Sequence, residues 1–188
     1  FQGENLLLAA GLAIATGADP SRVFDTLPQM RTVRGRMELA ATRENGAAVF
    51  VDYAHTPAAL SCVLKALRPH AQGRLHLVFG CGGDRDSGKR PEMGAIAGKL
   101  ADVVIVTDDN PRTEDAADIR AQILAAVPAA ADIGDRAQAI AEAVNGLGPG
   151  DLLVVAGKGH EQGQIIGEET RPFDDAEAVG VALKEIGQ

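Results

Sequence analysis

The sequence predicts an α/β fold in which helices cover both faces of a mostly parallel sheet. Three short apolar runs, at residues 75–79, 103–106 and 152–155, are typical of strands that are buried on both sides. Helical segments at residues 91–101, 115–127 and 135–146 alternate with them. Strands and helices that alternate at this spacing form βαβ units with right-handed crossovers, which indicates a parallel sheet.

The first 33 residues predict a separate helical segment. Residues 5–16 are apolar on nearly every helical face, which predicts a helix that needs to be buried on all sides. Gly17 should end this helix, and Asp19 and Pro20 supply the N-cap and first position of a short second helix. Because the chain begins abruptly in such a helix, we expect it to be the end of a longer protein.

From Arg36 the apolar period changes to that of strands. Residues 37–42 and 47–52 predict two strands joined by a hairpin turn at 44–46. The remaining elements follow from capping and turn signals. They are a helix from Thr56 to about residue 67, a strand at 164–166, a turn at 167–169 and a helix at 174–186.

The composition excludes several classes of function. The 188 residues include 18 Lys and Arg against 26 Asp and Glu, for a net charge of −8, and the basic residues form no run. We therefore expect no binding to nucleic acid or to an anionic membrane. The longest apolar stretch, residues 6–15, is too short to span a bilayer, and no basic segment precedes it, so we expect a cytoplasmic protein.

Three charged loops follow the three apolar strands, at residues 80–91, 107–113 and 156–161. Ligands of open parallel sheets bind beyond the carboxyl ends of the strands, so these loops should converge on one site. The cations in them are Arg85, Lys89, Arg90, Arg112 and Lys158, and the anions are Asp84, Asp86, Asp108, Asp109 and Glu161. This mixture suits a small zwitterion better than a bare phosphate.

Two of these signals also have simpler interpretations. Residues 83–89 fit the GxxxxGK pattern of a phosphate loop, but Arg90 occupies the position that needs a Mg²⁺-binding Ser or Thr, which argues against such a loop. The segment at residues 51–57 ends a strand and opens a helix. Asp52 and His55 there either approach a nucleotide at the helix N-terminus or serve the loop and the surface.

At these residues the sequence resembles the Mur ligases, and within them the branch that adds meso-diaminopimelate to the peptidoglycan stem peptide. The matching motifs are GRME at 35–38, VDYAHTP at 51–57, GCGGDRD at 80–86, DNPR at 109–112 and AGKGHE at 156–161, in the order of that family. The tetrapeptide of Asp109, Asn110, Pro111 and Arg112 resembles the recognition motif of the diaminopimelate-adding rather than the lysine-adding branch. Residues 1–7 resemble the end of the central domain, with Gln2 in place of an Asn of the family pattern.

The resemblance implies a three-domain enzyme of which this chain holds two parts. Residues 1–33 would be the C-terminal end of the central ATPase domain, and residues 34–188 the C-terminal, Rossmann-like domain that binds the incoming amino acid. ATP would phosphorylate UDP-MurNAc-L-Ala-D-Glu, and an amine of meso-diaminopimelate would attack the acyl phosphate. The phosphate loop and most Mg²⁺ ligands of the family belong to segments absent here, so we expect the isolated chain to be inactive. The resemblance also implies that the full-length enzyme is a monomer.

The resemblance also assigns roles to single residues. Arg112 would hold the far carboxylate of diaminopimelate through two parallel bonds, which lysine cannot accept because it lacks that carboxylate. The residues implied for the amino acid are Arg85, Asp109, Asn110, Pro111, Arg112, Gly157 and Glu161. Those implied for the nucleotide are Asn5, Arg36, Asp52 and His55. No general base for the attacking amine and no metal ligand is assigned.

Three other hypotheses stay open. The first is the same ligase chemistry with L-lysine as the amine, against which Arg112 argues. The second is a non-catalytic Rossmann-like module that binds a nucleotide or phosphate through residues 80–90. The third is a structural domain whose loops bind nothing.

Overall fold

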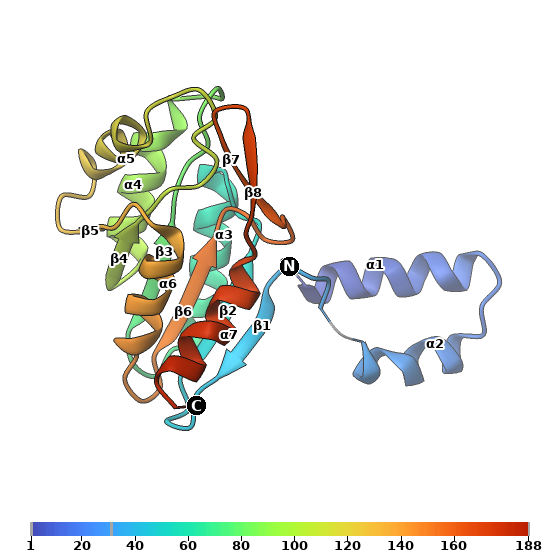
Figure 1. The fold of residues 1–188 in the computed structure, drawn as a ribbon. Coiled ribbons are helices and arrows are strands. Elements are labelled where there is room, and N and C mark those ends of the chain that lie inside the picture. The colour runs from blue at the N-terminus through green and yellow to red at the C-terminus, as the bar shows by residue number, and fades with distance from the viewer. Residues whose placement is uncertain (1, 31, 188) are drawn as a thin grey trace. The chain divides into compact units, whose positions relative to one another are not determined.

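The computed structural model describes residues 2–30 and 32–187, and for Gln2 it describes the backbone alone. The chain separates into two compact units, Phe1–Thr32 and Val33–Gln188 (Figure 1).

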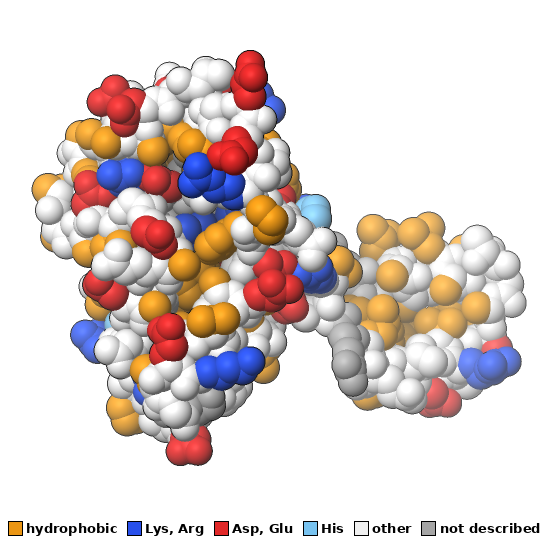
Figure 2. All heavy atoms as spheres, viewed as in Figure 1, with side chains coloured by type: hydrophobic (Ala, Val, Ile, Leu, Met, Phe, Trp, Pro, Cys, Tyr) orange, Lys and Arg blue, Asp and Glu red, His pale blue; other side chains and the backbone are white. Residues whose placement is uncertain are grey.

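The first unit consists of α1 (Gln2–Ala15), α2 (Pro20–Thr26) and the short 3₁₀ helix η1 (Leu27–Gln29). As predicted, the chain leaves α1 through Gly17 at a positive φ of 103°, and the Asp19 carboxylate caps α2 by accepting a bond from the Arg22 N–H. The sequence predicts that α1 needs burial on all sides, and within the described residues most of its apolar surface is uncovered. Among the described side chains of α1 only Ala10 is buried, while Leu7, Leu8 and Leu12 are exposed. Figure 2 shows apolar side chains spread over this unit.

The second unit contains a six-stranded sheet with helices on both faces, and a separate antiparallel pair of strands, β7 and β8 (Figure 1). Its elements are β1 (Glu38–Thr42), β2 (Ala48–Asp52), α3 (Pro57–Leu67), η2 (Arg68–His70), β3 (Leu75–Phe79), α4 (Lys89–Leu100), β4 (Val103–Val106), α5 (Ala116–Leu124), β5 (Ala131–Asp132), α6 (Arg136–Asn145), β6 (Leu152–Ala156), β7 (Gly163–Ile166), β8 (Glu169–Pro172) and α7 (Asp175–Glu185).

The strand order is β1-β2-β6-β3-β4-β5, with β1 antiparallel to β2 and all other pairs parallel. The last long strand of the chain, β6, therefore lies between β2 and β3. Every residue of β3 and β6 is buried, which explains their unbroken apolar sequences. The predicted α/β class is confirmed.

Two apolar clusters fix the sheet between its helices. One face packs Leu60 and Leu64 of α3 and Met93 of α4 against β3, β4 and β6. The other packs Ile140 of α6 and Val179 of α7 against β2, β3 and β6. Since the strands bury both faces, the places left for polar chemistry are the two ends of the strands and the loops that leave them.

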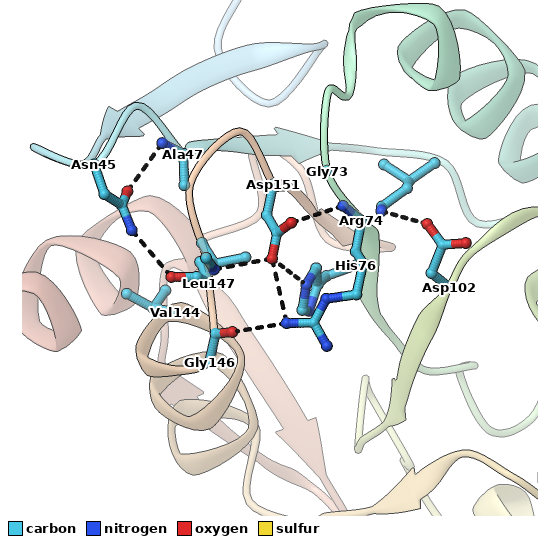
Figure 3. Close-up of polar contacts among 12 residues, drawn as sticks. Asn45, Ala47, Gly73, Arg74, His76, Asp102, Val144, Gly146, Leu147 and Asp151 are labelled. Carbon is cyan, nitrogen blue, oxygen red and sulfur yellow. Dashed lines mark hydrogen bonds and ion pairs between the residues drawn. The ribbon is translucent and has the colours of Figure 1, made fainter.

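The amino ends of β3 and β6 are joined by a buried polar network around Asp151 (Figure 3). The Asp151 carboxylate accepts bonds from the Arg74 backbone N–H at 2.6 Å and the Gly148 N–H at 2.9 Å, and its Oδ2 lies 3.0 Å from His76 Nε2. His76 and Asp151 are both almost fully buried. These bonds tie the segments that precede β3 and β6 to each other.

Candidate functional site

The three loops that follow β6, β3 and β4 meet at the carboxyl edge of the sheet, as the sequence predicts. Their strands are neighbours and run parallel, so the loops start side by side. The Gly83 N–H donates to the Asn110 carbonyl at 2.9 Å, which joins the first loop to the second. The Asn110 side chain then contacts Glu161 of the third loop.

Asn110 is the centre of this cluster and is buried. Its Nδ2 donates to Glu161 Oε2 at 3.0 Å. Its backbone carbonyl accepts a bond from Arg112 Nη1 at 3.3 Å. One residue thus contacts both a guanidinium, which suits a carboxylate ligand, and a carboxylate, which suits an ammonium ligand.

Arg112 has an unusual backbone that the β7–β8 hairpin holds in place. Its φ is +54°, a left-handed conformation that few residues other than glycine adopt. The Arg112 N–H donates to the Ile165 carbonyl at 3.1 Å, and its own carbonyl accepts the Gly167 N–H at 2.7 Å. The half-buried guanidinium donates through Nη1 to the Gly83 carbonyl at 2.8 Å. Among the described residues the guanidinium forms its hydrogen bonds through Nη1 alone, so Nε and Nη2 keep the two parallel donors that match a carboxylate.

Asp109, Pro111 and Gly157 form the tightly packed floor of the cluster. Asp109 and Pro111 are buried, and the Asp109 carbonyl accepts a bond from Gln164 Nε2 at 2.7 Å. Gly157 has a φ of +116°, and a Cβ at this position would lie 2.7 Å from Asp109 Oδ2. Glycine is therefore required here both for its backbone conformation and for the close approach of the Asp109 carboxylate.

Arg85, which we expected to hold a carboxylate, lies at the exposed rim of the cluster. Its Nη1 donates at 2.9 Å to the carbonyl of its neighbour Asp84. Asp84 itself is tied to the second loop, since its carboxylate accepts bonds from the Thr113 N–H and hydroxyl. The loop that carries Arg85 is thus held at its base, while the Arg85 side chain stays near the surface.

The phosphate-loop pattern at residues 83–89 is not used for a phosphate cradle. Arg90 is almost fully buried and makes a two-bonded ion pair with Glu114, with both bonds at 2.9 Å. A Cβ at Gly83 would lie 1.9 Å from the Pro111 carbonyl oxygen, so this glycine serves packing between loops. The sequence argument against a phosphate loop agrees with this geometry.

A second cluster lies around Tyr53 and contains two of the residues expected at a nucleotide. The Arg36 guanidinium lies over the Tyr53 ring, 4.5 Å from its centroid, which is the geometry of a cation–π contact. The rings of His55 and His160 lie 4.5 and 5.1 Å from that of Tyr53. His55 is oriented by its Nδ1, which lies 2.8 Å from the Tyr53 carbonyl.

Asp52 forms hydrogen bonds with backbone groups next to this second cluster. It is buried, and its two carboxylate oxygens accept bonds from the Met37 and Ala54 N–H groups, both at 2.8 Å. Burial raises the pKa of Asp52, while the two backbone bonds and the charge of Arg36 act in the opposite direction. Asp52 thus fixes the backbone next to Arg36.

The remaining candidate, Asn5, lies on α1 of the first unit, where its side chain is exposed. Within residues 2–30 and 32–187 no group of three His, Cys, Asp or Glu side chains could hold a metal ion. None of the described helices has the length and apolar character to cross a membrane.

Two buried basic residues that contact the first cluster were not among the predicted site residues. Lys158 was noted as a loop cation, yet it is fully buried beneath Asn110 and Glu161. Arg136 is fully buried, and its guanidinium donates to the Ala156 carbonyl at 3.0 Å. The glycines that flank Lys158 were the available signal, because they allow the chain to turn a charged side chain inward.

Comparison with known proteins gives this arrangement a family. The sequence profile described as "Mur ligase, glutamate ligase domain" matches residues 35–159. The chain is 55% identical over 186 residues to the UDP-N-acetylmuramoyl-L-alanyl-D-glutamate–2,6-diaminopimelate ligase of Agrobacterium fabrum and 58% identical over 185 residues to that of a Chelativorans species. These matches cover 99% and 98% of the chain but 38% of each relative. The chain therefore spans somewhat over a third of the length of these relatives.

Solved structures of Mur ligases have folds similar to that of this chain. A structure of a UDP-N-acetylmuramoyl-L-alanyl-D-glutamate–2,6-diaminopimelate ligase matches all of this chain and 39% of its own, with a TM-score of 0.79 and 40% identity. The UDP-N-acetylmuramate-alanine ligase of Thermotoga maritima matches 97% of this chain and 36% of its own, with a TM-score of 0.67. At 18% identity, the second match concerns the fold alone.

Proposed function

The chain belongs to the Mur ligase family, and on that premise we propose that it is the C-terminal, amino-acid-binding part of an ATP-dependent amide-bond ligase. The reaction proposed for the complete enzyme is the addition of meso-diaminopimelate to UDP-MurNAc-L-Ala-D-Glu in peptidoglycan precursor synthesis. The names of the relatives at 55–58% identity support this substrate.

The domain assignment is part of the proposal. Residues 1–33 are assigned to the end of a central ATPase domain and residues 34–188 to the C-terminal domain. Two observations support this assignment: the chain spans 38% of its relatives, and its two compact units are divided between residues 32 and 33. The complete enzyme would carry the missing segments before this chain, work as a monomer in the cytoplasm, and bind ATP and Mg²⁺ mainly through the central domain.

The observation that carries the proposal is the position of Asn110 between Arg112 and Glu161. A substrate with carboxylate and ammonium groups needs a cation and an anion held at a fixed separation. The free edge of Arg112 offers a carboxylate two parallel bonds, and Glu161 with Asp109 offers an ammonium group its counter-charge. Arg85, at the rim, would meet a carboxylate of the ligand as it enters.

This chain would contribute to the reaction mainly by positioning. In the proposed reaction ATP converts the γ-carboxyl group of D-glutamate to an acyl phosphate, which an amine of diaminopimelate then attacks. Holding that amine in line can supply roughly 7–11 kcal/mol of the barrier. On the nucleotide side, Arg36 is assigned to the phosphates of ATP and Asp52 to the neighbourhood of its adenosine. Asn5 and His55 are assigned to the nucleotide without a more specific role.

A calorimetric or NMR titration of this chain with meso-diaminopimelate and, separately, with L-lysine tests the proposal. Shifts confined to residues 80–90, 107–113 and 156–161 with diaminopimelate alone are the expected result. Equal binding of lysine would favour the lysine-adding branch, and nucleotide binding with no response to either amino acid would favour a nucleotide-binding module. If neither amino acid binds, the same titration of the complete enzyme with ATP and the UDP substrate decides whether the site needs the other domains.

A further inference from the structure

Lys158 places a positive charge inside the protein, directly beneath the amino-acid cluster. Its side chain is fully buried. Its Nζ donates to Asn110 Oδ1 at 2.9 Å and lies 3.4 Å from Glu161 Oε2 and 4.0 Å from Asp109 Oδ1. A buried ammonium group is tolerated only when acceptors surround it, and here all three acceptors belong to the candidate site.

The contacts of Lys158 determine how the Asn110 side chain is oriented. Asn110 Oδ1 accepts two bonds, from Lys158 Nζ and from the Ile165 N–H, each at 2.9 Å. The Nδ2 group therefore points the other way, toward Glu161. A flipped amide would place its NH₂ group against an ammonium and an N–H donor, and its oxygen against a carboxylate, so one orientation is strongly preferred.

The backbone is built to turn Lys158 inward. Gly157 and Gly159, on either side of it, have φ values of +116° and +54°. A Cβ at Gly159 would lie 2.7 Å from both the Gly35 carbonyl oxygen and Tyr53 Cβ. The loop is thus anchored on both sides, with Lys158 directed into the protein while the next side chain after Gly159, His160, is exposed.

We propose that Lys158 is a positioning residue for amino-acid selectivity. Since it is fully buried, it acts through Asn110 and Glu161 rather than by touching substrate. It holds the Asn110 amide with its donor toward Glu161 and holds the Glu161 carboxylate at the place where an ammonium group of the substrate would bind. This inference rests on the proposed function, because it concerns the same site.

The test is Lys158→Met in the complete enzyme, with steady-state kinetics for each substrate. The KM for diaminopimelate should rise by about tenfold or more, and the preference for diaminopimelate over lysine should fall, while kcat and the KM for ATP stay within about threefold. Lys65→Met is the matched control, since Lys65 is an exposed lysine on α3 and its loss should change none of these values. A lysine that served only the fold would not produce a change limited to one substrate.

Two further variants distinguish a folding defect, a wrong role for Lys158 and a wrong proposed function. Lys158→Gln, which keeps a donor without the charge, replaces Lys158→Met if the latter does not fold, with the same selective change expected. An unchanged KM for diaminopimelate in a folded variant, an equal change for all substrates, or failure of both variants to fold would each overturn the role of Lys158. Arg112→Ala, measured in parallel, separates the role of Lys158 from the proposed function. If Arg112→Ala has no selective effect on diaminopimelate use either, the proposed function itself fails.

Discussion

The guanidinium of Arg136 and the carboxylate of Asp175 form a fully buried ion pair, with Nε to Oδ1 at 2.7 Å and Nη2 to Oδ2 at 2.8 Å. The pair joins the first turns of α6 and α7. Arg136 also donates to the carbonyl of Ala156, the last residue of β6. The loop that carries Gly157, Lys158 and Glu161 therefore starts directly after a residue whose carbonyl is bound by the fully buried Arg136 guanidinium.

Asp175→Asn should lower the free energy of unfolding by about 3–5 kcal/mol, because it leaves the Arg136 charge buried without its counter-charge. Chemical denaturation of the chain measures this value. Glu169→Gln is the control, since it breaks an ion pair with Arg171 in which both side chains are largely exposed, and it should have no measurable effect. Equal stability of the two variants would show that the buried pair contributes little.

The stability of the chain should depend on pH through His76. Burial lowers the pKa of His76 below its ordinary value of 6.5, although the neighbouring Asp151 acts in the opposite direction. The unfolded chain then binds more protons than the folded chain between the two pKa values. The stabilisation is present above about pH 6.5 and is lost as the pH falls below it toward the folded pKa.

Unfolding free energies measured at a series of pH values from neutral to mildly acidic check this prediction. His76→Gln should reduce the acid-side slope, whereas His70→Gln, at an exposed histidine of η2, should preserve it. A further loss is expected at lower pH from Asp151. Burial would raise the pKa of Asp151, but its bonds from the Arg74 and Gly148 N–H groups and from His76 hold it below the ordinary value.

Arg112→Ala in the complete enzyme should raise the KM for diaminopimelate by roughly 10- to 100-fold, the loss of a charged hydrogen-bonding partner worth about 1.5–3 kcal/mol. Arg112→Lys keeps the charge but loses the planar fork, so it should recover only part of the affinity. The KM for ATP serves as the internal reference. Parallel loss of ATP and diaminopimelate use would contradict the assignment of Arg112 to the amino acid.

Gly157→Ala should destabilise the chain by about 1–3 kcal/mol, because alanine disfavours a positive φ and its Cβ would press on the Asp109 carboxylate. Gly180→Ala provides the opposite case. Gly180 lies inside α7 with open space around it, so alanine there should stabilise the helix by about 0.5–1 kcal/mol. Thermal and chemical unfolding of both variants measure the contrast.

Most of the sheet could be predicted because its strands are continuous apolar runs with clear boundaries. The bounds of β3 and β4 agree with the sequence prediction to the residue. β5 was missed because it has two exposed residues at the sheet edge and thus no burial pattern. β8 was missed for a similar reason: all four of its residues are exposed, and backbone pairing with β7 defines it.

The candidate site was predictable in place and less so in detail. The rule that parallel strands end at one edge brings the three loops together, whatever their side chains. Lys158 is buried, whereas Arg85 is exposed. This difference depends on the backbone turns at Gly157 and Gly159 and on how the loops pack against one another. Such turns leave no periodic pattern in the sequence.

The position of β6 between β2 and β3 also has a consequence for how the protein is made. During synthesis the β1–β2 hairpin and the β3–β4 pair leave the ribosome first, yet neither has a strand that joins it to the other. Their shared partner begins at Leu152, so the sheet cannot close until the nascent chain has been synthesised beyond that residue. Until then the apolar edges of both pieces are exposed, which is the stage at which chaperones would bind.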